Sequence, residues 1–268
     1  LVVDEARASK TMVDILQGNG AVPDPRLTLI LSKSQAWVQG KDGAEEWKGV
    51  PNGLPVTELS LPEYDNNHNS CIWGYMWGYD WNSAEKGDNI SKPKTDADFT
   101  PLGLMNYSEV CFLKAEAALR GWQGAGDAKT NYENGIRASF EEMRANAPKD
   151  SYSKSNDDKY ISEGNVAWNN ADSFEAKLEK IITQKWIGIY PNSEEAWAEF
   201  RRTGYPKLNP VKQSLEPTIN PKNGEFIKKL RYVDNELSNN KEYATDTTLN
   251  GGQGDGLSVS VWWDTARY

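Results

Sequence analysis

The feature that most constrains the fold is a helical hydrophobic pattern between residues 107 and 145. Apolar residues from Val110 to Leu119 recur at the three- and four-residue spacing that places side chains on one helix surface. Gly121 follows as a C-cap, and the alanines of this stretch allow a second helix to approach closely. That second helix is predicted from four large residues spaced to share one face: Tyr132, Ile136, Phe140 and Met143. The two segments predict an antiparallel helical hairpin.

A second hairpin is predicted between residues 172 and 203. Asp172 and Asn192 each stand three residues before a glutamate, the spacing of a capping box. Between them runs a buried stripe to which Lys185 contributes only its stem, and Pro191 and Gly204 end the two helices. Paired helices that combine small residues with large aromatics resemble tetratricopeptide packing. The predicted fold class is mainly α, with tetratricopeptide-like hairpins, long irregular loops and little strand.

The flanking regions lack a sustained period. We predict one domain in three parts: a loop-rich ligand face over 1–100, a helical scaffold over 101–205 and a loop-rich C-terminal region over 206–268. Residues 27–31 fit a strand or a helical turn. Residues 257–263 fit a short terminal strand or an extended tail.

Charge and residue counts exclude several classes of protein. The 30 basic and 39 acidic residues leave a net charge of −9, which argues against a nucleic-acid surface. No apolar stretch approaches the roughly 20 residues that span a bilayer, and the first residues show no export signal. A single histidine, His68, and two cysteines, Cys71 and Cys111, exclude a Cys/His zinc site. A Ser-His-Asp triad would require His68.

Two motifs fail on their context. The run from Asp65 to Asn69 begins like an EF-hand loop, but Ser70 replaces the glycine and Met76 replaces the bidentate glutamate. The glycine-rich run 251–256 precedes β-prone residues, whereas a phosphate loop opens a helix. No cofactor is expected, and a calcium ion is compatible with the sequence but not indicated by it.

The histidine and the cysteines are interpreted as structural. His68 lies among asparagines, which favours a surface loop histidine over a base or ligand. Cys71 and Cys111 could form a disulfide in an exported protein, but the position of Cys111 on a buried helix face favours a free core thiol. Carboxylates are plentiful, and no pair of them is singled out as a glycosidase site.

The sharpest candidate site is a segment in which aromatic residues alternate with mostly small ones: Trp73, Tyr75, Trp77, Tyr79 and Trp81. If the segment is extended, the five rings share one face at about 6.6 Å intervals. Flat rings in a row suit sugars, and the negative charge disfavours nucleic-acid bases. The alternative is a half-buried strand whose rings pack over the helices. The glycines between the rings favour some display, because a core strand does not need a bare opposite face.

Several blocks of sequence, taken together, resemble the SusD/RagB-like family of nutrient-binding outer-membrane lipoproteins. They are residues 106–121, 181–190, 195–206 and 261–264, with a looser likeness at 24–27. The resemblance implies helical hairpins that support a loop-rich ligand face. It also implies a cell-surface protein, lipid-anchored to the outer membrane, that captures oligosaccharides or peptides for a TonB-dependent SusC-like transporter and is not an enzyme.

The resemblance covers the family's C-terminal portion. The family's lipidated N-terminal cysteine and helical N-terminal part have no counterpart here, so we expect a chain that begins midway. Arg201 and Arg202 are expected to contact carboxylates around a helix end with bidentate geometry. We predict glycan binding by stacking on Trp73, Trp77 and Trp81, with Tyr75 and Tyr79 adding stacking or hydroxyl hydrogen bonds. The alternatives are a peptide- or protein-binding role and a glycoside hydrolase.

Overall fold

The computed structural model describes residues 6–18, 22–78, 81–88, 103–148, 151–240, 242 and 254–264. The regular secondary structure of these residues is helical, and their strand-like pairing is limited to two isolated bridges, Arg7 with Cys71 and Ser9 with Val50. The α-helices are α1 (Lys10–Gln17), α2 (Leu27–Ile30), α3 (Gln35–Val38), α4 (Val56–Leu59), α5 (Tyr107–Leu119), α6 (Ala128–Arg144), α7 (Asp157–Ser162), α8 (Phe174–Gly188), α9 (Ser193–Thr203) and α10 (Asp234–Asn239). Short 3-10 helices are η3 (Pro62–Tyr64), η4 (Tyr75–Trp77), η5 (Trp81–Ser83) and η6 (Pro221–Asn223). The predicted mainly α fold class is confirmed.

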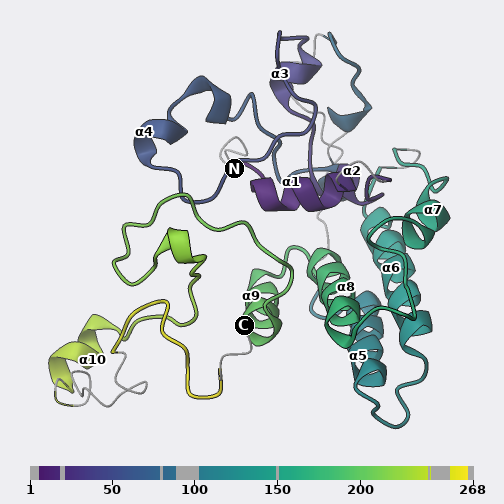
Figure 1. Cartoon of the computed structure of the whole chain (residues 1–268). Coiled ribbons are helices and arrows are strands. Elements are labelled where there is room, and N and C mark those ends of the chain that lie inside the picture. The colour runs from purple at the N-terminus through teal and green to yellow at the C-terminus, as the bar shows by residue number, and fades with distance from the viewer. Residues whose placement is uncertain are drawn as a thin grey trace.

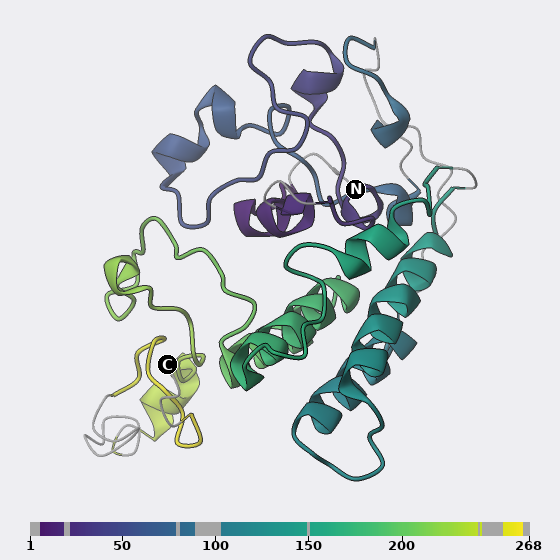
Figure 2. The same cartoon turned by 45° about the vertical axis from the view of Figure 1, so that its right-hand side comes forward.

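The long helices form one packed group. α5 and α6 make the predicted hairpin, α8 packs against both, and α9 follows beside α8 (Figures 1 and 2). The predicted α6 face is buried: Tyr132, Ile136 and Phe140 lie in the core of this group, and Met143 is buried in a second core described below. The members of the core of this group are Phe112, Ala115, Tyr132, Ile136, Phe140, Tyr160, Ile161, Leu178, Ile181 and Ile182.

A glycine sets how closely α5 and α6 approach. A Cβ atom added to Gly135 of α6 would lie 2.6 Å from the Phe112 ring of α5. Because real Cβ contacts do not reach this distance, the phenyl ring occupies the space that a side chain at position 135 would need.

The helix caps agree with the sequence predictions, except at the start of α8. Gly121 and Gly204 adopt left-handed conformations just past α5 and α9, as glycines do at helix ends. Asn192 caps α9 by accepting a hydrogen bond from the backbone N–H of Glu195. The cap predicted at Asp172 is wrong by one residue, because Ser173 caps α8. The Asp172 carboxylate instead accepts a hydrogen bond from Lys180 Nζ at 2.7 Å.

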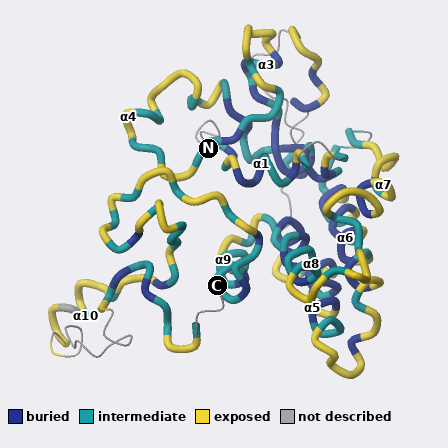
Figure 3. The backbone as a smooth tube through the Cα atoms, in the orientation of Figure 1, coloured by how far each residue is buried: buried dark blue, intermediate teal, exposed yellow. Residues whose placement is uncertain are grey.

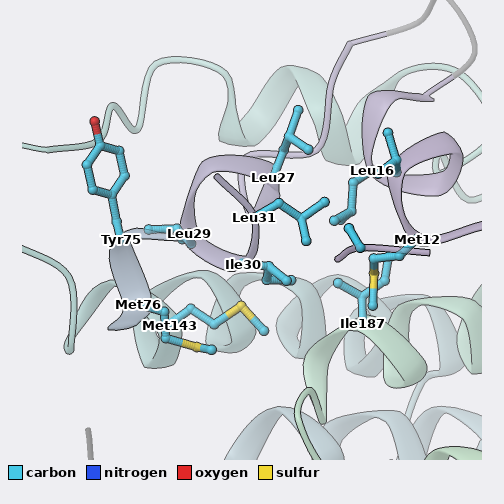
Figure 4. Close-up of a cluster of buried hydrophobic side chains, with 12 residues drawn as sticks. Met12, Leu16, Leu27, Leu29, Ile30, Leu31, Tyr75, Met76, Met143 and Ile187 are labelled. Carbon is cyan, nitrogen blue, oxygen red and sulfur yellow. The ribbon is translucent and has the colours of Figure 1, made fainter. Parts of the chain in front are cut away.

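The described residues between 6 and 88 contain more helical turns than their sequence pattern indicates. Residues 27–31 adopt the helical alternative as α2, and Ser9 caps α1 through the backbone N–H of Met12. Side chains from α1, α2 and η4 share a second core with Met143 of α6 and Ile187 of α8 (Figure 4). Through this core, α1, α2 and η4 pack against the helical group of α5, α6 and α8.

A buried polar network joins the same two regions. Arg26 and Asp24 form an ion pair whose side chains are fully buried, with Arg26 Nη2 2.6 Å from Asp24 Oδ2. Arg26 Nη1 donates to Ser139 of α6 at 3.1 Å, and Nη2 donates to Gln184 of α8. The Tyr160 hydroxyl of α7 donates to Asp24 Oδ2 at 2.6 Å. Although burial lowers the pKa of Arg26, the Asp24 carboxylate raises it above the ordinary value, so the guanidinium stays charged.

The region after α9 consists of turns and short helices with much exposed surface (Figure 3). Residues 257–263 contain turns and form no strand. Of the two predicted alternatives, a terminal strand and an extended tail, the tail is therefore closer to the structure. Cys71 and Cys111, both described, are not joined by a disulfide, and Cys111 is buried as expected.

Candidate functional site

The tryptophan-rich segment 73–84 is not an extended strand in its described residues. It contains the 3-10 helices η4 and η5, and Gly78 between them adopts a left-handed conformation. These turns break the two-residue alternation that an evenly spaced row of rings requires. Tyr79 lies outside the described residues.

Two of the four described rings of this segment are buried. Tyr75 is 3% exposed and packs beside Leu29 and Met76, as Figure 4 shows. Trp81 is 6% exposed and packs against Val38 and Ala84. These two rings match the packing alternative, because their faces lie against the protein rather than solvent.

The glycine before η4 has a different role from the one that the sequence indicates. A Cβ atom on Gly74 would lie 2.5 Å from the backbone oxygen of Thr28 and 2.6 Å from that of Leu29. Gly74 is therefore small because the backbone of α2 lies against it, and not because one face of the segment is bare.

Trp73 and Trp77 are the partly buried rings of the segment. Their ring centroids are 5.0 Å apart and their planes meet at 76°, which is an edge-to-face pair. Trp77 also packs against the core formed by α1, α2 and η4. The Trp73–Trp77 pair is therefore held by this core, while part of its surface stays accessible to solvent.

A third partly buried tryptophan lies beside Trp81. Trp37 of α3 packs against the small cluster of Val38, Trp81 and Ala84. Lys33 Nζ lies 4.8 Å from the Trp37 ring centroid, within cation–π range. Sequence reasoning did not identify Trp37, because Trp81 and Ala84, against which it packs, lie more than 40 residues away in the sequence. No local pattern reports such a contact.

His68 is a loop histidine, as expected, with about a third of its side chain exposed. Its Nδ1 lies 2.8 Å from Asp65 Oδ1, which also accepts the backbone N–H groups of Asn67 and His68. Burial would raise the pKa of Asp65, but the hydrogen bonds from His68 outweigh it and hold that pKa below its ordinary value. Across the described ranges, no group of three or more His, Cys, Asp or Glu residues is arranged to hold a metal ion.

Charged side chains around α9 are mutually paired. Arg202 donates to both oxygens of Glu116 at 2.7 and 2.6 Å, so the predicted bidentate contact is confirmed for this arginine. Arg201 differs: it donates to the backbone oxygen of Lys228 and stacks 4.1 Å from the Trp197 ring centroid.

The prediction that only the stem of Lys185 is buried is wrong. Its ammonium group is buried too, 2.7 Å from Glu195 Oε1.

The described cavities lie elsewhere. One of about 590 Å³ is bordered by α1, α8 and the loop before α8, and another of about 340 Å³ lies where α5, α6 and the end of α8 meet. Neither is lined by the tryptophan-rich segment. In the larger one Lys180 is paired with Asp172 and Lys207 with Glu179, so both lysines of its lining already have a carboxylate partner within the protein.

Comparison with known proteins identifies the family. The family model of SusD-like proteins, described as SusD and RagB outer membrane lipoproteins, matches residues 3–264. This chain belongs to the SusD-like family, as the sequence resemblance predicted. No curated protein matches the chain. Among the described residues, no helix is long and apolar enough to cross a membrane.

Solved structures of the family share the fold. A chitin-binding SusD homologue from Flavobacterium johnsoniae is 30% identical with a TM-score of 0.68, over 96% of this chain and 49% of that one. A SusD-like protein from Bacteroides thetaiotaomicron is 27% identical with a TM-score of 0.67, over 97% and 51%. A SusD homologue from Bacteroides ovatus is 28% identical with a TM-score of 0.68, over 97% and 52%. The chain therefore spans about half the length of these structures.

Proposed function

We propose that this chain binds oligosaccharides at the cell surface through its tryptophan-rich segment. As part of an outer-membrane lipoprotein on the extracellular side, it would pass them to a TonB-dependent SusC-like transporter without catalysing a reaction. Two findings support the proposal: membership of the SusD-like family, and a structural relative that is described as chitin-binding.

The observation that carries the proposal is the partly buried pair of Trp73 and Trp77. Two perpendicular rings 5.0 Å apart form a corner with one ring face and one ring edge. The C–H face of a pyranose stacks on an aromatic plane. Trp37, which packs beside Trp81 with Lys33 Nζ 4.8 Å from its ring centroid, offers a further partly buried ring. Tyr75 and Trp81 are the buried rings of the segment, so we expect them to support the partly buried rings and not to contact the sugar.

The expected affinity is modest. By analogy with bases, each stacked ring contributes about 1–3 kcal/mol, and the sugar must shed water to bind. Two rings therefore contribute about 2–6 kcal/mol together, and the middle of this range corresponds to a dissociation constant on the order of 1 mM. Such an affinity is measurable by calorimetry at high ligand concentration.

The test is a calorimetric titration of the chain with a panel of oligosaccharides, chitin oligosaccharides included, and with peptides. The Trp73→Ala/Trp77→Ala double variant is compared with the Trp122→Ala variant. Trp122 is a matched control, because it is 68% exposed in the connection between α5 and α6. Figure 1 shows this connection at the end of the hairpin that lies away from α1 to α4. Helical circular dichroism confirms that each variant is folded.

We expect saturable sugar binding that the double variant loses and the Trp122 variant keeps. Sugar binding that survives in the folded double variant would place the site elsewhere. Binding of peptides that excess oligosaccharide does not displace would favour a peptide-binding protein, and release of shorter sugars during the titration would favour a glycoside hydrolase. Each of these last two outcomes contradicts the proposal.

A further inference from the structure

Asn82 makes three side-chain hydrogen bonds that join the tryptophan-rich segment to residues 28–33. It follows Trp81 in η5, and it is 7% exposed. Its Nδ2 donates to the backbone oxygens of Thr28 and Leu31 at 2.8 and 2.7 Å, and its Oδ1 accepts the backbone N–H of Lys33 at 2.7 Å. The carboxamide therefore spans the end of α2 and the start of the next loop.

A carboxamide suits this position because a short helix leaves backbone carbonyl groups without hydrogen-bond partners. α2 is a single turn, and the last carbonyl groups of a helix have no partner within it. An amide side chain supplies two N–H donors for such carbonyls and one oxygen acceptor in the same planar group. A carboxylate of equal size has the acceptor but lacks both donors.

Lys33 extends the contact to the Trp37 ring. Its backbone N–H is held by Asn82, while its Nζ donates to the backbone oxygen of Ala84 at 3.1 Å and pairs with Glu46 at 3.2 Å. The same Nζ lies 4.8 Å from the Trp37 ring centroid. Asn82 and Lys33 thus connect segment 81–84 with residues 28–37 at several points, and Trp37 stands at the end of this connection.

We propose that Asn82 is a positioning residue of the glycan site. It sets where Lys33 and the Trp37 ring lie relative to Trp81, and because it is buried it does not contact the sugar itself. This inference rests on the proposed glycan binding and adds that affinity depends on the connection between residues 28–37 and η5. It places Trp37 among the rings that contact the sugar.

The test is the Asn82→Asp variant, which keeps the side-chain shape and the acceptor but sets an oxygen against two carbonyl oxygens. Asn131→Asp is the matched control. Asn131 is also a buried amide, and its Nδ2 donates to the backbone oxygen of Ala125 at 2.7 Å, at the start of α6. Both variants are titrated with the oligosaccharide that the wild-type chain binds best, at a temperature where circular dichroism shows both folded.

We expect Asn82→Asp to weaken sugar binding roughly tenfold, the factor that corresponds to about one hydrogen bond, and Asn131→Asp to leave it unchanged. Because Asn82 acts through Trp37, the Asn82→Asp change should have no further effect in a Trp37→Ala background. Equal weakening by both asparagine variants, or additive effects of Asn82→Asp and Trp37→Ala, would overturn the inference.

A second variant covers the case in which Asn82→Asp does not fold. Lys33→Met removes the bond to Ala84 and the cation over Trp37, and we expect a similar loss that is again non-additive with Trp37→Ala. Unchanged affinity in Lys33→Met would overturn the inference. If the Trp73→Ala/Trp77→Ala variant loses binding while the Asn82 and Lys33 variants keep it, this inference fails and the proposed function stands. If the tryptophan variants keep binding, the proposed site itself fails.

Discussion

The most informative stability prediction concerns the buried ion pair of Asp24 and Arg26. Replacing Arg26 with Met removes four side-chain hydrogen bonds: two to Asp24, one to Ser139 and one to Gln184. The Asp24 carboxylate then stays buried with the Tyr160 hydroxyl as its remaining side-chain donor among these partners. Because removing one member of a buried pair leaves an uncompensated charge, we expect Arg26→Met to cost about 3–5 kcal/mol of unfolding free energy.

The Asp24→Asn/Arg26→Met double variant tests the cause of that loss. Removing both charges eliminates the uncompensated carboxylate, so the double variant should be less destabilised than the sum of the single variants, with a coupling of about 0.5–3 kcal/mol. Lys154→Met is the control, because Lys154 and Glu141 form an exposed pair at 2.8 Å. An exposed pair contributes only about 0–1 kcal/mol.

The measurement is equilibrium urea unfolding followed by circular dichroism and tryptophan fluorescence. Coincident transitions by the two probes justify a single unfolding free energy. An Arg26→Met cost near that of Lys154→Met would refute the reasoning, because the network would then not hold the loop-rich region to the helices. Strict additivity of the Asp24 and Arg26 changes would refute it as well.

Three further predictions follow from single contacts. Hydrogen bonds from Arg202 outweigh burial and hold the pKa of Glu116 below its ordinary value of 4.5. The contribution of Glu116 to stability is therefore complete above pH 4.5, and it is lost as the pH falls through the lower pKa of the folded state. Glu116→Gln should therefore flatten the acid limb of a stability–pH profile by at most about 1.4 kcal/mol per pH unit, and parallel limbs would contradict this. Gly135→Ala sets a Cβ 2.6 Å from the Phe112 ring and should cost about 1–3 kcal/mol in urea unfolding, whereas the exposed Asn134→Ala should stay within about 0.5 kcal/mol. Gly74→Ala sets a Cβ 2.5 Å from the Thr28 oxygen and should change the near-ultraviolet circular dichroism of the tryptophans, and an unchanged spectrum would contradict the close contact.

The helical hairpins were predictable because their determinants are local. The spacing of Tyr132, Ile136, Phe140 and Met143 identifies one face of α6 without knowledge of the rest of the chain. The cap of α8 was misplaced by one residue because Asp172 and Ser173 are both good caps in sequence. Only the structure shows that Lys180 engages Asp172.

The candidate site was only partly predictable, because its shape depends on distant contacts. The tryptophan-rich segment is visible in the sequence, but the alternation of Trp73, Tyr75 and Trp77 does not reveal that a 3-10 turn buries the middle ring. The partners of Asn82 lie 49 to 54 residues away. Composition and periodicity carry no signal for a hydrogen bond of that range.

The most direct test of the central claim is a crystal structure of the chain with a bound oligosaccharide, chosen as the tightest ligand in the calorimetric panel. The account predicts a sugar ring stacked on Trp73 or Trp77, with Trp37 at the same ligand. A sugar bound in the cavity of about 590 Å³ between α1 and α8, with the tryptophan-rich segment unoccupied, would contradict it.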